Sequence, residues 1–372
     1  MHNIRLTKLL HKLPATVPFI GPETQERYLG KAFSARLGAN ENVFGTSPKA
    51  ISAMQSATSE IWKYGDPTSY DLRSAIAEIL RIDPINLIVG EGIDGLLGYL
   101  VRMIIESGDN VVTSDGAYPT FNYHVAGFGG VLHKVPYKND CEDLEGLLEK
   151  VKSTNAKLVY LANPDNPMGT AHKAQMVEKF IQSLPESCLL ALDEAYIEFA
   201  SHDIPLQTTL IFQNVIRFRT FSKAYGMAGA RVGYAFGPSG LIAQFEKVRN
   251  HFGMNRVAQV GALAALKDDC WLSNVLQQVT KAKAIIKQIA SQNSLTTVPS
   301  ETNFVAIDCG NGKAFAKAVL TQLVEHGVFV RMPLVSPQDR CIRVSAGAEA
   351  DLDFFAKVFP KALELSRSSG FC

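Results

Sequence analysis

The sequence lacks the closely spaced cysteines and histidines that bind metal ions. It has no Cys-x-x-Cys pair, and the two nearest of its six cysteines are Cys341 and Cys372. Its eight histidines form neither a His-x-x-x-His nor a His-Glu-x-x-His pattern. Because these absences exclude the common zinc signatures, we expect no metal site. The cysteine usage also predicts reduced thiols, as in a cytoplasmic protein.

The sequence also lacks a net charge and a long hydrophobic run. Its 37 basic and 36 acidic residues give a formal charge of +1, so no field attracts nucleic acid or an anionic membrane. No apolar segment is long enough to span a bilayer. Residues 1–14 are basic but lack the apolar core and cleavage site of a secretory signal. We expect an arm that packs on the protein there, with a transit peptide as the alternative.

The length of the chain predicts more than one domain. With 372 residues, 47% of them apolar and 20% charged, the sequence is typical of a globular protein that is too long for one compact core. We therefore expect a large domain with a smaller one attached. Changes in the sequence pattern place an N-terminal arm at residues 1–40, the large domain at 41–245 and the small C-terminal domain at 246–372.

Short β-branched runs alternate with amphipathic segments between residues 86 and 237. This alternation is typical of βαβ units and predicts a three-layer α/β domain with a mainly parallel sheet. Helices are expected over residues 94–108 and 141–151, where apolar residues recur at three- and four-residue spacing. The expected strands are residues 86–90, 110–115, 131–136, 157–163, 188–196, 215–223 and 230–237.

The pattern changes after residue 240. One helical pattern covers residues 241–266, and further helix follows it. Strands are then expected at residues 303–308, 327–332 and 341–345. This order predicts a bridging helix that leads into a smaller α+β domain.

A glycine-rich turn separates the first expected strand from the next helix. Its glycines are Gly90, Gly92 and Gly95. They would let the backbone approach an anion, with the amides of Ile93 and Asp94 directed at a phosphate from the helix N-terminus. The same Gly-x-Gly-x-x-Gly spacing matches the dinucleotide-binding fingerprint, with Asp115 as its acidic residue. A tight turn that binds nothing is a third interpretation.

Two motifs follow later strands of the same expected sheet. In "NPDNP" the prolines stiffen a turn and leave the Asn166 carboxamide free to hydrogen-bond a phenolate-like oxygen. Asp193 ends an apolar strand, where a carboxylate could hold a protonated pyridine nitrogen, and Tyr196 offers a phenol from the same turn. The ordinary alternatives are a stiff loop and an aspartate that caps the next helix.

The fourth motif, "RFRTFSKAYGMAGAR", surrounds a lysine with hydroxyl groups. Thr220 and Ser222 precede Lys223, and Arg231 follows it. A lysine among apolar residues and close to another cation favours its amine form, as a nucleophile requires. Hydroxyls and a guanidinium are also phosphate ligands. A solvated surface lysine is the ordinary alternative.

Together the four motifs resemble the fold type I, class I/II aminotransferases that depend on pyridoxal 5′-phosphate (PLP), and within them the histidinol-phosphate aminotransferase branch. The resemblance runs from "ARLGANENVFGTSPKA" and "KYGDPTSYDLRSAIAEIL" to "GVFVRM" and "CIRVSAG". It implies PLP as the cofactor, small amine and keto-acid substrates, and a homodimer. It disfavours NAD, since a dehydrogenase gives no reason for a lysine and an asparagine at these places.

The resemblance also implies individual roles. Lys223 forms the Schiff base and moves a proton at the substrate Cα, Asp193 holds the pyridine nitrogen, and Tyr196 is the third expected catalytic residue. Phe121 stacks on the cofactor ring, where the branch more often has tyrosine. The expected cofactor ligands are Gly92, Ile93, Asp94, Phe121, Asn166, Asp193, Tyr196, Thr220, Ser222, Lys223 and Arg231, with Tyr64 from the neighbouring subunit.

Substrate binding is implied for Arg331, Arg343 and Asn42. Arg343 matches the carboxylate-binding arginine of the family, and both arginines could converge on an anionic group of the substrate. Two solvated arginines are the alternative. Three positions depart from the pattern of the branch: Phe19 lies near its phosphate-binding tyrosine, Met168 replaces a threonine, and Gly95 replaces a glutamate.

The resulting expectation is an aminotransferase that exchanges an amino group between glutamate or 2-oxoglutarate and a small amine such as histidinol phosphate or an aromatic amino acid. A PLP-dependent decarboxylase resembling threonine-phosphate decarboxylase stays open, because the sequence does not show which Cα bond breaks. An NAD-dependent dehydrogenase is a remote alternative. A non-catalytic PLP-binding regulator is disfavoured, because the first residues show no helix-turn-helix pattern.

Overall fold

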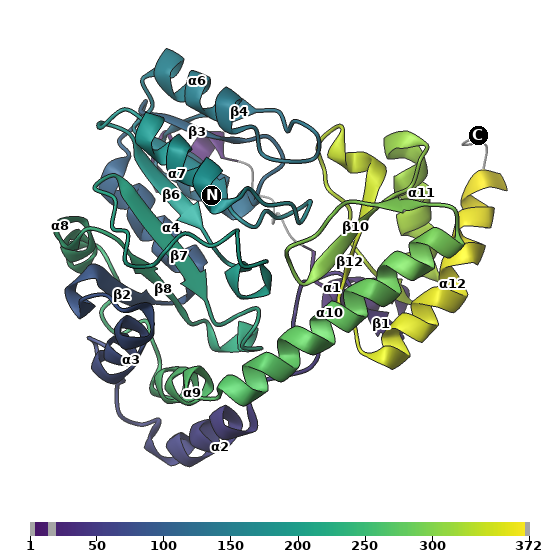
Figure 1. Cartoon of the computed structure of the whole chain (residues 1–372), viewed down its shortest axis with the longest axis horizontal. Coiled ribbons are helices and arrows are strands. Elements are labelled where there is room, and N and C mark those ends of the chain that lie inside the picture. Colours follow the sequence, from purple (N-terminus) through teal and green to yellow (C-terminus); the bar gives the residue numbers. More distant parts are fainter. Residues whose placement is uncertain (1–3, 14–19, 369–372) are drawn as a thin grey trace.

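The computed structural model describes residues 4–13 and 20–368. They form a large α/β domain and a smaller α+β domain, and Figure 1 shows the long helix α10 (Asp269–Gln292) running from one to the other. A mainly parallel central sheet lies in the large domain and a smaller sheet in the other. The predicted fold class is confirmed.

The large domain is built on a seven-stranded sheet with the order β2-β8-β7-β6-β5-β3-β4. Neighbouring strands are parallel except at β8, which runs antiparallel to both β2 and β7. All seven strands expected from the sequence are present. They are β2 (Leu87–Gly90), β3 (Asn110–Ser114), β4 (Val131–Val135), β5 (Leu158–Ala162), β6 (Leu189–Asp193), β7 (Val215–Thr220) and β8 (Gly233–Phe236).

Helices cover both faces of this sheet, because its strands are apolar on both sides. Tyr160 of β5 belongs to an apolar cluster with α4 and α5, whereas its neighbour Val159 packs with α6 and α7 on the opposite face. Alternation along the strand thus produces the three layers. The covering helices are α4 (Gly92–Ile104), α5 (Pro119–Gly127), α6 (Leu144–Thr154) and α7 (Ala174–Ser183).

The sheet order contradicts the dinucleotide-binding interpretation of Gly90, Gly92 and Gly95. That fingerprint requires a parallel βαβ unit with adjacent strands. Here β2 lies at one edge of the sheet and pairs only with antiparallel β8, whereas β3 lies next to the opposite edge. The turn between β2 and α4 is therefore not part of a dinucleotide-binding unit.

The expected single helix over residues 241–266 is wrong. The segment forms α8 (Ser239–Ile242), a 3₁₀ turn and a loop before α9 (Arg256–Leu266) begins. Asn255 starts α9, because its side chain accepts a hydrogen bond from the Ala258 amide at 2.8 Å. The bridging helix is α10, further along the chain. Since α9 packs in the apolar cluster of α3 and β8, packing favours a division after Leu266, and the boundary at 245/246 stays a prediction.

The small domain contains a three-stranded antiparallel sheet with the order β12-β10-β9. Its elements are β9 (Thr296–Thr297), β10 (Phe304–Asp308), α11 (Gly312–Glu325), β11 (Val328–Phe329), β12 (Cys341–Ser345) and α12 (Glu349–Ser368). β11 pairs in parallel with β1 (Ala35–Arg36), and Ala35 and Leu37 belong to the core of this domain. The end of the expected arm is thus built into the small domain. The chain then enters the large domain through α2 (Pro48–Ala57) and α3 (Tyr70–Leu80), whereas α1 (Pro22–Leu29) precedes β1.

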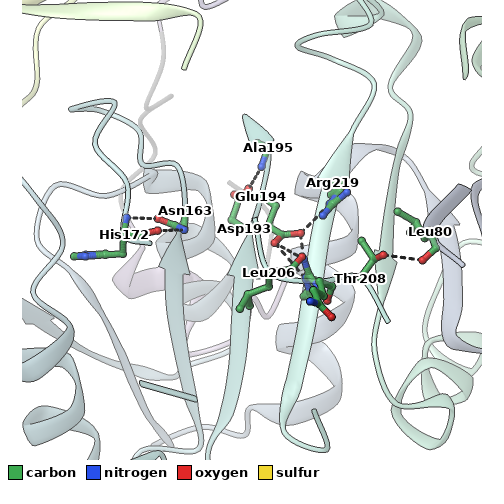
Figure 2. Close-up of polar contacts among 11 residues, drawn as sticks. Leu80, Asn163, His172, Asp193, Glu194, Ala195, Leu206, Thr208 and Arg219 are labelled. Carbon is green, nitrogen blue, oxygen red and sulfur yellow. Dashed lines mark hydrogen bonds and ion pairs between the residues drawn. The ribbon is translucent and has the colours of Figure 1, made fainter. Parts of the chain in front are cut away.

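A buried ion network joins the ends of β6 and β7. The Glu194 carboxylate accepts hydrogen bonds from Arg217 Nη2 at 2.7 Å and from Arg219 Nε at 2.8 Å. Figure 2 shows Glu194 facing Arg219 from the neighbouring strand. Arg217 also donates to the carbonyl oxygens of Leu206 and Gln207. The network therefore fixes the strand ends that carry the residues discussed next.

Glu194→Gln should destabilise the protein, because it leaves two buried guanidinium groups without their counter-charge. We expect a loss of about 3–5 kcal/mol in the free energy of unfolding, measured by urea unfolding followed by circular dichroism. Glu60→Gln is the matched control, since Glu60 pairs with Lys63 at the surface and should cost far less. Equal losses in the two variants would contradict a structural role for the network.

Candidate active site

Predicted site residues follow three adjacent parallel strands. Asn166 follows β5, Asp193 ends β6, and Lys223 follows β7. These strands are neighbours in the order β7-β6-β5, and both pairs are parallel. Their carboxyl ends therefore lie at one edge of the sheet, where open α/β sheets bind ligands.

The Asp193 carboxylate is buried and partly hydrogen-bonded. One oxygen accepts a hydrogen bond from the Tyr160 hydroxyl at 2.7 Å, and the other accepts from the Ala195 amide at 2.9 Å, as Figure 2 shows for Ala195. Burial raises the pKa of Asp193 to about 6, although both hydrogen bonds oppose the rise. The group is therefore ionised near neutral pH, with lone pairs left for a cationic partner.

The Lys223 amine is held among cations. Its Nζ donates to the carbonyl oxygen of Asn40 at 3.2 Å and lies 5.7 Å from the centre of the Tyr196 ring. Burial first, and then the charges of Arg343 and Arg231, lower the pKa of Lys223 to about 8. The uncharged fraction of this amine near neutral pH is therefore small but far larger than that of an ordinary lysine, and the uncharged form is what a nucleophile or general base requires.

Asn40 is a site residue that the sequence did not reveal. Its amide donates to the Tyr196 hydroxyl at 3.0 Å, and its side-chain oxygen accepts from Ser345 Oγ at 2.9 Å. Together with the carbonyl contact to Lys223, these bonds link β12 to Lys223 and Tyr196, two of the three predicted catalytic residues. Its φ of 54° is a conformation in which asparagine is enriched, but the sequence analysis singled out the nearby Asn42 instead.

A cationic cradle, formed by Gly92, Ser222 and Arg231, lies where α4 begins. The side chain of the N-cap residue Glu91 makes no capping hydrogen bond, and a Cβ atom on Gly92, which has a φ of +79°, would lie 2.6 Å from Arg231 Nη2. Arg231 Nη1 lies 3.4 Å from Ser222 Oγ, which is 2.9 Å from Thr220 Oγ1. The predicted phosphate ligands thus converge. An uncapped helix N-terminus beside a guanidinium and hydroxyls is a geometry that binds phosphate.

Two arginines meet on adjacent segments of the small domain. Arg331 and Arg343 form a β-bridge, in which the Arg343 amide donates to the Arg331 carbonyl at 2.6 Å. Arg343 donates to the Asn166 side-chain oxygen, which leaves the Asn166 NH₂ group as the available donor. Burial lowers the pKa of Arg343 to about 10, and its Nε has no hydrogen-bond partner among the described residues. Arg331 donates to the Ile20 carbonyl at 3.0 Å.

Other predicted site residues have structural partners of their own. The Asn42 amide donates to the Ala224 carbonyl at 3.0 Å, and its oxygen accepts from the Phe44 amide at 3.1 Å. Tyr64 is 77% exposed and packs on Phe252, with ring centres 4.7 Å apart. Their contacts with substrate and cofactor stay predictions. Phe19 lies outside the described residues.

No metal centre or membrane segment appears in the part of the chain that the structure describes. Over residues 4–13 and 20–368 no three histidine, cysteine, aspartate or glutamate side chains gather into a metal-binding group. None of the described helices is both long and apolar enough to cross a bilayer. Five cysteines are described, and all five are free thiols.

The fold and the site together define an enzyme that transfers amino groups. The family model of class I and II aminotransferases matches residues 35–359. Histidinol-phosphate aminotransferase 2 of Carboxydothermus hydrogenoformans is 33% identical over 362 residues, which cover 96% of this chain and 99% of that protein. Histidinol-phosphate aminotransferase 1 of Bacillus cereus is also 33% identical, over 94% of each chain. The chain belongs to the class I and II aminotransferases, and the resemblance to the histidinol-phosphate aminotransferase branch is confirmed.

Solved structures show the same relationship. Histidinol-phosphate aminotransferase from Sinorhizobium meliloti, in complex with pyridoxal-5′-phosphate, is 49% identical, with a TM-score of 0.94 over 97% of this chain and 98% of that chain. Aspartate aminotransferase from Thermus thermophilus with maleate is 21% identical, with a TM-score of 0.81 over 97% of this chain and all of that one. The latter shares the fold.

The environment of Lys223 predicts how its amine titrates. Arg343→Met removes the neighbouring charge that most lowers the Lys223 pKa, so the titration midpoint of the Lys223 amine should rise from about 8. It should stay below the ordinary lysine value, because burial is the larger cause. Arg343→Lys keeps the charge and is the matched control. The measurement is the pH dependence of reductive methylation of Lys223 in the protein freed of cofactor, followed by peptide mass spectrometry. An unchanged midpoint in Arg343→Met would contradict this account.

Proposed function

We propose that this aminotransferase uses PLP to exchange an amino group between glutamate or 2-oxoglutarate and a small amine, with histidinol phosphate as the favoured amine. The observation that carries the proposal is Arg343, whose charge acts on Lys223, together with Arg331, which forms a β-bridge with it. The names of the relatives and the PLP in the Sinorhizobium meliloti structure support it.

The residues present fit PLP. The cradle of Gly92, Ser222 and Arg231 suits a phosphate, and the part-satisfied Asp193 carboxylate suits a protonated ring nitrogen. Asn166 and Tyr196 would hold the ring oxygen. When bound, PLP supplies an aldehyde that takes up the amino group and a ring that accepts electrons from Cα. Lys223 would hold this aldehyde between turnovers.

The protein contributes proton transfer and electrostatics. Lys223 would take the proton from the substrate Cα and give it up again later in the reaction, because its lowered pKa makes the amine form accessible near neutral pH. Asp193 would remain ionised and would keep the ring nitrogen of bound PLP protonated. Asn40 holds Lys223 and the Tyr196 hydroxyl in position through its two hydrogen bonds.

The arginine pair recognises the anionic end of the substrate. Arg343 is buried beside Asn166 and presents its unpaired Nε, so it would bind the carboxylate of glutamate in a bidentate contact. Arg331 would add a contact for a second anion or a phosphate. Because glutamate carries its carboxylate where histidinol phosphate carries its phosphate, one pair serves both substrates.

The active unit is proposed to be a cytoplasmic homodimer. Exposed aromatic and aliphatic side chains gather around Tyr64: Ile61, Trp62 and Phe252 are each more than half exposed. Grouped apolar side chains of this size are typical of an interface. In the dimer Tyr64 would reach the phosphate of the neighbouring site, as the family resemblance implies.

Lys223→Ala should abolish amino-group transfer while the protein still binds PLP through its other contacts. The reason is that Lys223 is the proposed base at Cα but only one of many cofactor contacts. Lys283→Met is the matched control, because burial also lowers the pKa of Lys283 to about 8, and its amine donates to the Ser300 carbonyl on the small domain. The control should keep its turnover. Near-wild-type transfer by Lys223→Ala would contradict the assignment.

Substitutions of Arg343 and of Arg331 should impair the enzyme on different substrates. Arg343→Lys should raise the KM for glutamate, because an ammonium cannot reproduce the bidentate contact. Arg331→Ala should lower kcat/KM for histidinol phosphate more than for a neutral aromatic amino acid, by about tenfold or more if one charge-assisted bond is lost. Steady-state kinetics of both variants on glutamate, histidinol phosphate and a neutral aromatic amino acid measures this. Equal losses would reject Arg331 as a phosphate contact, and carbon dioxide release in place of keto-acid formation would reject transamination.

A further inference from the structure

Tyr160 connects two of the predicted cofactor contacts, although no motif singled it out. Its hydroxyl donates to Asp193 Oδ2 at 2.7 Å. Its ring stacks on Phe121, with ring centres 4.7 Å apart and planes inclined by 21°. Tyr160 and Phe121 are completely buried. One side chain therefore touches both the residue expected to hold the ring nitrogen and the residue expected to face the ring.

Strand register explains how Tyr160 reaches Asp193. In the parallel pair β5 and β6, Tyr160 lies opposite Ala191, and Ala162 lies opposite Asp193. Tyr160 and Ala162 are two positions apart, so their side chains point to the same face of the sheet. The residues opposite Tyr160 and Asp193 are the alanines Ala191 and Ala162, which leave room for the phenol to extend along the sheet to the carboxylate.

The phenol is a permanent donor to this carboxylate. Burial raises the pKa of Tyr160 well above its ordinary value, so its proton stays in place. Among the described residues, Tyr160 provides the side-chain hydrogen bond that Asp193 accepts, and the other bond comes from the backbone of Ala195. A hydrogen bond to the charged form of a buried acid favours ionisation.

Other charged groups near Asp193 act through space. Lys223 favours the ionised carboxylate, and Glu194 disfavours it. Tyr118, Glu142 and Tyr196 also interact electrostatically with Asp193. Because Tyr160 adds a directed bond, its removal should change the behaviour of Asp193 without changing these charges.

We propose that Tyr160 is a positioning residue, whose hydroxyl keeps the Asp193 carboxylate ionised and oriented towards the ring nitrogen of PLP and whose ring supports Phe121. This inference rests on the proposed function, since it takes Asp193 as the partner of that nitrogen. It adds a residue from the core of the strand to the site, and it assigns the residue an electrostatic effect that a purely structural tyrosine would lack.

The experiment measures the dissociation constant of PLP as a function of pH for wild type and Tyr160→Phe, which keeps the ring and removes the hydroxyl. Free PLP titrates identically in every measurement, so differences between the curves report groups of the protein. Protonated Asp193 must lose its proton to hold the ring nitrogen, so binding weakens as the pH falls through its pKa of about 6. In Tyr160→Phe this weakening should begin about one to two pH units higher.

The difference in PLP affinity between wild type and Tyr160→Phe should depend on pH. At the acid end, binding should be about tenfold weaker than wild type for each unit of the shift. At the alkaline end the curves should converge, because Asp193 is then ionised in both proteins. A curve for Tyr160→Phe with the wild-type midpoint would overturn the proposal.

Tyr137→Phe is the matched control for the loss of a buried phenol. Tyr137 is also buried, and its hydroxyl donates to another buried carboxylate, Asp165, at 2.7 Å. Its removal should lower stability to a similar extent and leave the midpoint of PLP binding unchanged. A shift of equal size in Tyr137→Phe would show a nonspecific effect and overturn the proposal.

Asp193→Asn separates this inference from the proposed function. If Asp193 holds the ring nitrogen, the neutral amide should weaken binding and remove the inflection near pH 6. An unchanged Asp193→Asn curve would reject the role of Asp193 itself, whereas a lost inflection with an unshifted Tyr160→Phe curve would reject the role of Tyr160 alone. If Tyr160→Phe does not fold, a more acidic 3-fluorotyrosine at position 160 tests the opposite direction, and the midpoint should move down.

Discussion

The parallel pairing of β5, β6 and β7 is the constraint on which the site depends. Adjacent parallel strands end at the same edge, so three loops distant in sequence deliver an amide, a carboxylate and an amine to one place. Glu194 and its two arginines hold the ends of β6 and β7 together with buried charge. The sheet therefore fixes the large-domain half of the site, and β12 adds Arg343 and Ser345 from the small domain.

Much of the architecture was predictable because it follows local periodicity. Most strands of the large sheet have an apolar run bounded by turn residues, and the helices expected at residues 94–108 and 141–151 correspond to α4 and α6. The shorter elements were not predictable. β1 and β9 contain two residues each and exist only through their partners. The helical pattern over residues 241–266 hid the break before Asn255, because the apolar residues of the loop recur at a helix-like spacing.

The site shows the same division between local and tertiary information. Lys223, Asp193 and Asn166 stand in motifs whose chemistry is visible without coordinates. Asn40 and Tyr160 do not: the first is one polar residue in a loop, and the second is one aromatic residue in a buried strand. Their roles arise from contacts across β12 and β6, which strand register decides.

The contribution of β1 to the small-domain core has a consequence for synthesis on the ribosome. Ala35 and Leu37 are translated early, yet the strands and helices that bury them lie beyond residue 268. The small domain is therefore discontinuous in the chain. Its first strand, β1, cannot pair with β11 until the entire large domain has been synthesised. Asn40 follows this strand, so the contacts that hold Lys223 and Tyr196 through Asn40 and Ser345 form only when translation is nearly complete. A nascent chain that has finished its parallel sheet is still catalytically incomplete.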